Sequence, residues 1–340
     1  MAERLLEVTD LSTYFKTDRG VVRAVDGVSC TLDAGATLGV VGESGCGKSV
    51  LSRSIMGLLP KHGTIRGGSA QFDGIEIVGK SPKQLRRIWG TGMSMIFQDP
   101  MTSLNPVVKI GRQLTEGLQL HFDMDSKFAL DTAEELLRSV GIPEPRKRLS
   151  QYPFEMSGGM RQRIVIAIAL SCGPKLLFAD EPTTALDVTV QKTILNLLAE
   201  QQRERRMAMV LVTHDLGVVA GRTDEIMVMY AGQVVEKAKT TTLFSNLKHP
   251  YTEALLKSIP KVSDPSHTRL DSIPGRPPNL IHPPSGCRFA PRCVYADAKC
   301  HAELPPLTAA PGDPSHLFRC WKPVSMLATN SSASNLAGVR

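Results

Sequence analysis

The chain has 340 residues, of which 42% are hydrophobic and 21% are charged, and its formal net charge is +7. This length and composition suit a soluble globular protein with one large core, or one core and a small appendage. The longest uninterrupted apolar run, residues 164–170, has seven residues, whereas a membrane-spanning helix needs about 18 to 20. The first residues lack the apolar stretch of a signal peptide, so we expect a soluble, cytoplasmic protein.

The excess positive charge is spread over small groups of basic residues, at 86–87, 146–148 and 203–206. A nucleic-acid-binding tail would concentrate such residues in one long run. An anionic membrane surface or a phosphate ligand accounts for the charge equally well. We therefore expect no nucleic-acid partner.

Alternation of short apolar segments with helical patterns indicates the fold class. Strands are predicted at residues 5–15, 31–33, 37–41, 70–72, 93–97, 176–179, 209–212 and 225–230. Helices are predicted at 48–59, 128–140 and 188–206, and only the second of these lies between residues 98 and 157. This order indicates an α/β fold with a mostly parallel core sheet. The early strands, which have no helices between them, predict an N-terminal antiparallel β-subdomain.

The C-terminal part has a different composition. From about residue 246 prolines interrupt the long periodic patterns, and four of the seven cysteines follow within a short span. We predict a main domain at 1–245 and a small cysteine-containing extension at 246–327. The last residues, 328–340, are small and polar, which predicts a disordered tail.

Residues 42–49 read GESGCGKS and match the phosphate-loop pattern, with a predicted strand before them and a predicted helix after them. Glycines let backbone N–H groups wrap a polyphosphate, and a helix N-terminus adds the positive end of its dipole. We expect Lys48 to contact the β- and γ-phosphates of ATP and Ser49 to bind Mg²⁺. The remaining expected nucleotide contacts in the loop are Gly42, Ser44, Gly45, Cys46 and Gly47. A glycine-rich turn that matches by chance is the alternative.

A second half of the site is predicted where the apolar run 176–179 ends in two carboxylates, Asp180 and Glu181. Alternation along a strand points the two side chains in different directions. Asp180 is expected to hold Mg²⁺, and Glu181 is expected to polarise the water that attacks the γ-phosphate. The pair is weak evidence alone and strong evidence beside a phosphate loop.

Residues 156–163 (MSGGMRQR) resemble the signature of the ATP-binding cassette superfamily, and Ser157 stands 23 residues before Asp180 (157 to 180). Met156 replaces the usual leucine and Met160 replaces a frequent glutamine. The resemblance implies that Ser157, Gly158 and Gly159 contact the nucleotide of a second cassette, so that ATP lies between two subunits. An ordinary helix N-cap at Ser157 is the alternative.

Further positions match the motifs of this superfamily. The resemblance implies that Gln98 senses Mg²⁺ and water, and that His214 contacts the γ-phosphate. It implies that Asp187, in a D-loop at 185–187, communicates across the dimer. Phe15 matches the aromatic residue that stacks on adenine, with Tyr14 as the neighbouring candidate. The resemblance thus implies a cassette ATPase at 1–245 with a helical subdomain at about 99–172, and a catalytic set of Lys48, Gln98, Glu181 and His214.

The class of cassette ATPase follows from what the chain lacks. Members that act in DNA repair insert long coiled coils, whereas only 59 residues separate Gln98 from Ser157 (98 to 157). Members that act in translation usually carry two cassettes, and this chain has one. A transporter subunit with separate permeases is favoured, and an ATPase acting on nucleic acid or ribosomes is the alternative. A regulatory module without turnover is disfavoured by Glu181 and His214.

Residues 249–256 (HPYTEALL), 273–275 (IPG) and 284–293 (PSGCRFAPRC) closely resemble the C-terminal extension of oligopeptide and dipeptide importer ATPases. Residues 98–106 (QDPMTSLNP) resemble the Q-loop of the same family. The resemblance implies ATP-driven peptide uptake at the cytoplasmic face of the inner membrane. It also implies two permease subunits, a second, commonly non-identical ATPase and an extracytoplasmic solute-binding protein. Related importers carry nickel complexes, glutathione or oligosaccharides, and these solutes are the alternatives.

The clustered cysteines have the spacing C-x5-C-x6-C-x19-C, with no C-x-x-C pair, which does not favour a zinc ribbon. Four thiolates suit an iron–sulfur cluster, and the resemblance associates this extension with a [4Fe–4S] centre. A cluster would staple a region too short to build its own core. Zinc and free thiols are the alternatives, and three nearby histidines are possible substitute ligands. The residues concerned are Cys287, Cys293, Cys300 and Cys320, with His282, His301 and His316.

Overall fold

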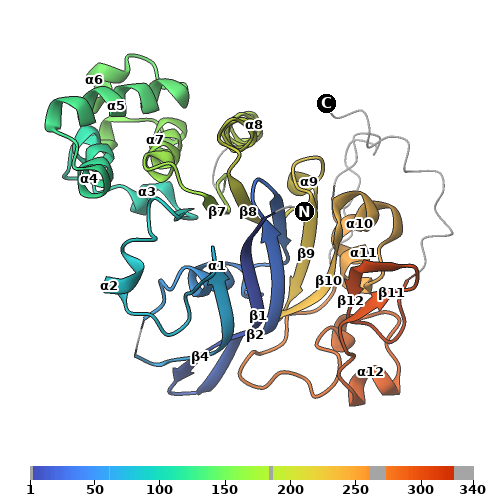
Figure 1. Ribbon diagram of the computed structural model, residues 1–340. Coiled ribbons are helices and arrows are strands. Elements are labelled where there is room, and N and C mark those ends of the chain that lie inside the picture. The colour runs from blue at the N-terminus through green and yellow to red at the C-terminus, as the bar shows by residue number, and fades with distance from the viewer. Residues whose placement is uncertain (1–2, 61, 184–186, 260–272, 325–340) are drawn as a thin grey trace. The chain divides into compact units, whose positions relative to one another are not determined.

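The computed structural model describes residues 3–60, 62–183, 187–259 and 273–324. Figure 1 shows their helices and strands. These residues belong to two compact units. The first unit takes its residues from 1–6, 32–36 and 72–212, and the second from 7–31, 37–71 and 213–340. The predicted tail at 328–340 lies outside the described residues. No helix in the described part of the chain is long and apolar enough to cross a membrane.

The first unit contains three parallel strands, β6 (Met93–Ile96), β7 (Leu176–Asp180) and β8 (Ala208–Thr213). β7 lies in the middle, because Leu176 is opposite both Met93 and Ala208. All of β7 is buried, which explains why its first four residues are all apolar. Parallel strands end at the same edge of a sheet, so the residues that follow β6 and β7 meet there.

Helices connect β6 to β7 in the first unit, and α4 packs on α5 (Figure 1). The sequence pattern predicted α5 and a helix that begins after Ser157, and it missed α4, where Ile110, Leu114 and Leu118 are buried at helical spacing. α5 begins at Ser126 because the Asp125 carboxylate accepts the Phe128 N–H at 2.9 Å. These helices are α3 (Pro100–Ser103), α4 (Ile110–Phe122), α5 (Ser126–Ser139), α6 (Pro145–Leu149), the 3₁₀ turn η1 (Pro153–Glu155) and α7 (Gly158–Leu170). β5 (Ile75–Glu76), α2 (Pro82–Leu85) and α8 (Val188–Arg205) complete the unit.

Most of the hairpin of β1 (Arg4–Thr17) and β2 (Gly20–Asp33) belongs to the second unit, and β4 (Thr64–Phe72) pairs with the other side of β1. Two residues connect β1 to β2, a length that only antiparallel neighbours allow. The predicted N-terminal antiparallel sheet is therefore confirmed.

The second unit also holds strands in the order β11-β12-β10-β9-β3. β3 and β9 are parallel, and the others pair antiparallel, which makes the core sheet mixed. β12 comes from the cysteine-containing extension and pairs with β10, with Phe318 opposite Glu236. The predicted domain boundary near residue 245 stays a prediction. The strands are β3 (Thr37–Val41), β9 (Glu225–Tyr230), β10 (Gln233–Lys239), β11 (Thr308–Ala310) and β12 (Asp313–Phe318).

The helices of the second unit are short. α1 (Lys48–Ile55) ends before its predicted limit at residue 59, because Gly57 adopts a left-handed φ of 70° just after the C-cap residue Met56. The other elements are α9 (Leu216–Val219), α10 (Thr240–Asn246), α11 (Pro250–Lys257), the 3₁₀ turn η2 (Ala290–Arg292) and α12 (Ala298–Ala302).

Candidate functional site

The phosphate loop leads from β3 directly into α1 and depends on glycine for its path. A Cβ atom on Gly42 would lie 2.2 Å from the Met229 carbonyl oxygen, and one on Gly47 would lie 2.1 Å from the Ala24 carbonyl oxygen. Gly45 and Gly47 also have φ values of 80° and 107°, which residues with a side chain rarely adopt. The backbone of the second unit therefore excludes side chains at both ends of the loop.

Lys48 lies beneath this loop and is 4% exposed. Its Nζ donates hydrogen bonds to the carbonyl oxygens of Gly42 at 2.7 Å and Glu43 at 3.1 Å. The Cys46 thiol is buried, and burial raises its pKa. Cys46 is thus a small neutral filler, whereas Ser44 and Gly45 are exposed and available to a ligand.

In the first unit the Q-loop and the carboxylate pair meet. The Gln98 Nε2 atom donates to the Glu181 Oε2 atom at 3.0 Å. Glu181 has a left-handed φ of 46°, and its N–H donates to the Val212 carbonyl oxygen at 2.9 Å. This conformation costs a non-glycine residue about 1–2 kcal/mol and is typical of functional sites. Asp180, the last residue of β7, is fully buried.

The signature residues stand at the start of α7. The Ser157 hydroxyl accepts the Met160 N–H at 3.3 Å, so the serine caps the helix as the plainer alternative states. Ser157 and Gly158 are nevertheless exposed. The open N-terminus of a 13-residue helix attracts anions. The capping role and a phosphate contact are therefore compatible, and the contact stays a prediction.

The remaining predicted site residues are placed individually. The Asp187 carboxylate caps α8 by accepting the Val190 N–H at 2.9 Å, while residues 185 and 186 of the D-loop lie outside the described residues. The Tyr14 hydroxyl donates to the Asp26 carboxylate at 2.5 Å. Successive residues of a strand point to opposite faces, so Phe15 points away from Tyr14. His214 directly follows β8 and is exposed.

The two units divide these residues between them. Each unit by itself has the groups described above, and the assembly of both sets around one nucleotide stays a prediction. The second unit carries Phe15, Lys48, Ser49 and His214, and the first carries Gln98, Ser157, Gly159, Asp180, Glu181 and Asp187.

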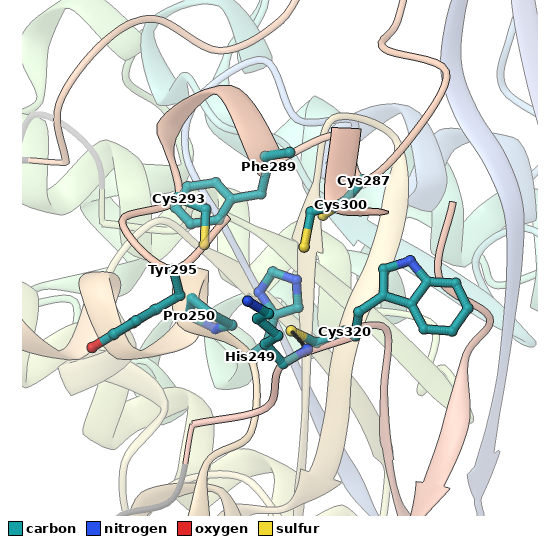
Figure 2. A pocket seen from close by; sticks show the side chains of 11 residues that line it. His249, Pro250, Cys287, Phe289, Cys293, Tyr295, Cys300 and Cys320 are labelled. Atoms are coloured by element: carbon teal, nitrogen blue, oxygen red, sulfur yellow. Dashed lines mark hydrogen bonds between the residues drawn. The ribbon is translucent and has the colours of Figure 1, made fainter. Parts of the chain in front are cut away.

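Four cysteines of the extension line one pocket (Figure 2). Their thiols are free, and the side chains in Figure 2 surround the His249 ring. The pKa of the Cys320 thiol is raised to about 12, mainly by burial and to a smaller extent by the neighbouring thiols of the other three cysteines. The pKa values of Cys287 and Cys293 are also raised, first by burial. These three thiols are therefore protonated at neutral pH.

The structure does not place the three candidate substitute histidines in this pocket. His316 is fully buried and pairs with Glu236 at 2.8 Å, while His282 and His301 are exposed. The histidine that lines the pocket is His249, whose Nδ1 atom accepts the Tyr251 N–H at 3.0 Å. Among the described residues, no three His, Cys, Asp or Glu side chains are arranged to hold a metal ion.

Sequence reasoning also missed two arginines that connect the extension to the phosphate-loop region. Arg292 pairs with Glu43 of the loop at 2.6 Å, and Arg288 pairs with Asp26 of β2. Both arginines lie between Cys287 and Cys293, in a segment that the pattern marked only as a family feature. Two arginines four positions apart in a cysteine-flanked segment were the available signal.

Comparison with known proteins agrees with this arrangement. A family model described as "ABC transporter" matches residues 25–184, and one described as "Oligopeptide/dipeptide transporter, C-terminal region" matches residues 235–300. The oligopeptide transport ATP-binding protein OppD of Haemophilus influenzae is 50% identical over 93% of this chain and 97% of its own length. The dipeptide transport ATP-binding protein DppD of Bacillus subtilis is 48% identical over 94% of this chain and 95% of its own length.

Solved structures show the same fold. The dimeric ATP-binding cassette MJ0796 bound to ADP and Pi has a TM-score of 0.62 and 25% identity, over 69% of this chain and 98% of that one. The structure of cbiO1 from Clostridium perfringens has a TM-score of 0.59 and 25% identity, over 71% of this chain and 91% of that one. These matches and the phosphate loop agree that the fold is that of a P-loop cassette ATPase. The chain belongs to the ATP-binding subunits of the oligopeptide/dipeptide branch of the ABC transporter family.

Proposed function

We propose that this chain is the ATP-hydrolysing subunit of an importer of di- or oligopeptides and works at the cytoplasmic face of the inner membrane. The observation that carries the proposal is the contact between Gln98 and Glu181 at the shared edge of β6 and β7. This contact places the carboxylate of Glu181, a residue with a strained backbone conformation, next to the glutamine that the family uses to sense water and Mg²⁺. The relatives' names, which specify oligopeptide and dipeptide transport, favour peptides over other solutes.

The proposed chemistry is positioning and charge neutralisation, as phosphoryl transfer requires. Lys48 and the loop N–H groups of residues 42–49 would hold the phosphates of ATP, with Phe15 stacked on adenine. Ser49, Gln98 and Asp180 would hold Mg²⁺, which neutralises phosphate charge. Glu181 would accept a proton from the attacking water, and His214 would contact the γ-phosphate.

The proposed assembly contains two ATPase subunits, two permeases and an extracytoplasmic solute-binding protein. Ser157, Gly158 and Gly159 would contact the partner subunit's nucleotide, and Asp187 would contact the partner. The similar cassette MJ0796 is a dimer, which supports pairing, and the family resemblance favours a non-identical second ATPase. We place the nucleotide-binding domain at 1–245, with the helical part at about 99–172 docking on a permease, and the extension at 246–327.

Substitution of the carboxylate tests the enzymatic proposal. We expect Glu181→Gln to lower Mg²⁺-dependent phosphate release from the assembled transporter by about 10²-fold, with binding of a fluorescent ATP analogue retained. Glu303→Gln, at an exposed position of the extension, is the matched control. Equal turnover in Glu181→Gln and the unsubstituted protein would sink the assignment.

We also infer that Cys287, Cys293, Cys300 and Cys320 hold a [4Fe–4S] cluster. Four free thiols around one pocket, beside the apolar side chains of Pro250 and Phe289, are a suitable donor set. The spacing of the four cysteines, C-x5-C-x6-C-x19-C, contains no C-x-x-C pair, which does not favour zinc. When bound, the cluster supplies a covalent staple for the extension.

Metal analysis separates the alternatives for this pocket. Protein purified without oxygen should be brown and contain iron and acid-labile sulfide, and Cys300→Ser should lower both. Cys172→Ser, outside the extension, is the control. A colourless, zinc-loaded preparation would contradict the cluster.

A further inference from the structure

The segment 287–293 connects the cysteine pocket with the phosphate loop inside the second unit. It begins and ends with cysteines that line the pocket, and its Phe289 lines the pocket as well. Its two arginines reach away from the pocket to elements of the proposed nucleotide site. One short segment therefore contacts both places.

Arg292 is held by a complete set of hydrogen bonds. Its side chain is 3% exposed, and its Nη1 and Nη2 atoms donate to the two carboxylate oxygens of Glu43 at 2.6 and 3.0 Å. The other bonds go to the carbonyl oxygens of Pro274 and Ile273, at 2.8 and 3.2 Å, and to the Tyr230 hydroxyl at 3.3 Å. An arginine has five N–H donors in a rigid fork. All five are used, in a geometry that lysine does not offer.

The charge of Glu43 gives this contact a consequence for nucleotide binding. Glu43 is the second residue of the phosphate loop, where an unpaired carboxylate would repel a bound triphosphate. Arg292 neutralises that carboxylate through a bidentate, charge-assisted pair. The hydrogen bond to Glu43 raises the pKa of Arg292 above its usual value, which keeps the guanidinium charged.

Glu43 is also fixed through its backbone. Its N–H donates to the Tyr251 hydroxyl at 2.8 Å. The Phe289 ring packs 5.3 Å from the Tyr251 ring and 5.2 Å from the Tyr230 ring, measured between centroids. The same segment thus supports both the side chain and the backbone of this loop residue.

The second arginine anchors the segment to β2. Arg288 is buried and pairs with Asp26, whose carboxylate also accepts a hydrogen bond from the Tyr14 hydroxyl. Two residues before Asp26, the Ala24 carbonyl oxygen is the backbone group that leaves no room for a side chain at Gly47 of the phosphate loop. The segment therefore contacts the phosphate loop through Arg292 and the neighbouring strand through Arg288.

We propose that segment 287–293 couples the cysteine pocket to nucleotide binding, with Arg292 as a positioning residue that neutralises and orients Glu43. This inference rests on the proposed nucleotide site. Coupling between two sites is reciprocal. A ligand of the pocket and a nucleotide on the loop must therefore change each other's affinity by the same factor. Because the segment ends in Cys287 and Cys293, we also expect a bound nucleotide to change how fast these two cysteines react.

A double substitution tests the electrostatic part, with Mg²⁺ and a fluorescent ATP analogue titrated into the full chain. Arg292→Gln should weaken binding about tenfold, within the range of ordinary coupling between sites. Glu43→Gln added to Arg292→Gln should restore most of the affinity, because the unpaired carboxylate is then gone. A merely structural role of Arg292 predicts no such rescue. Arg276→Gln, at an exposed position of the same extension, should bind as the unsubstituted chain does.

Alternative outcomes are distinguishable. Unchanged affinity in Arg292→Gln, or a double variant as weak as Arg292→Gln, overturns the coupling and leaves the proposed function intact. Failure of the unsubstituted chain to bind nucleotide overturns both. Thermal unfolding checks that each variant is folded, and Arg292→Met, which has a side chain of similar length without the charge, replaces Arg292→Gln if that variant is not.

The effect of the nucleotide on the pocket is measured in the full chain without a bound cluster, so that the cysteine thiols are free to react. Saturating Mg²⁺ and ATP analogue should slow the labelling of Cys287 and Cys293 by a thiol reagent several-fold, as followed by peptide mass spectrometry. In Arg292→Gln the nucleotide should lose this effect. Identical labelling rates with and without nucleotide in the unsubstituted chain would overturn the proposal.

Discussion

The phosphate loop and the cysteine pocket are both proposed ligand sites of the second unit, but the chain builds them differently. The loop consists of consecutive residues, 42–49, whose path depends on missing side chains at Gly42 and Gly47. The pocket depends on side chains brought together from positions as distant as His249 and Lys322. A local site of the first kind is readable in the sequence, whereas the second kind becomes visible only in the fold.

The two sites also differ in how far they are prepared for a charged ligand. The loop offers backbone N–H groups and the start of α1 in a fixed arrangement, with the Lys48 Nζ atom held by hydrogen bonds to two loop carbonyl oxygens. Three of the pocket thiols, those of Cys287, Cys293 and Cys320, are protonated at neutral pH, because burial raises their pKa values. A cation must displace these protons when it binds, so occupancy of the pocket should weaken as the pH falls.

The largest effect on stability is expected at Gly47. It tests whether the path of the loop depends on a missing side chain. In Gly47→Ala the new Cβ atom would overlap the Ala24 carbonyl oxygen, 2.1 Å away, at a left-handed φ of 107°. The backbone has to move, and we expect a loss of about 3 kcal/mol in the free energy of unfolding. Urea unfolding without nucleotide measures this loss.

Gly45→Ala is the matched control in the same loop. Gly45 has a φ of 80°, but a Cβ atom there meets nothing within 4 Å. Only the cost of the left-handed conformation remains, about 1 kcal/mol. If both alanine variants lose the same stability, steric exclusion by the neighbouring backbone does not determine the path of the loop.

The sequence was sufficient to predict elements that are determined by consecutive residues. The bounds of β3 and β9 were predicted to the residue, because each is a short apolar run that is almost fully buried. The helix after the phosphate loop was predicted too long, since Leu58 and Leu59 continue the apolar pattern while Gly57 turns the backbone. α4 was missed because its two glycines, Gly111 and Gly117, weaken the helical pattern.

The candidate site divides in the same way. The phosphate loop and the carboxylate pair are contiguous motifs, and the sequence located both. The Arg292–Glu43 pair joins residues 249 positions apart, and no local spacing indicates such a contact. His249 was likewise quoted only as part of a family motif, because its place in the pocket depends on how β10 and β12 bring the extension together.

The smallest effect is expected at Cys30, a buried thiol outside the pocket that can be compared with the pocket thiols. Cys30 lies in β2, and burial raises its pKa to about 11, against 9.0 for an unburied thiol. Below pH 9 the thiol is protonated in both the folded and the unfolded chain. As the pH rises from 9 to 11, only the unfolded chain loses the proton, so the free energy of unfolding falls.

Between about pH 7.5 and pH 10 this loss should amount to about 1 kcal/mol. In Cys30→Val the titrating group is absent, so the unfolding free energy should fall less over the same interval, while other groups contribute equally to both proteins. Equal pH dependence of the two proteins would show that burial does not hold the Cys30 proton. Loading the pocket with its ligand should leave the difference in pH dependence between the unsubstituted protein and Cys30→Val unchanged. A bound cation displaces protons only from the thiols that bind it. Cys30 thus separates burial, which keeps a thiol protonated, from ligand binding, which removes its proton.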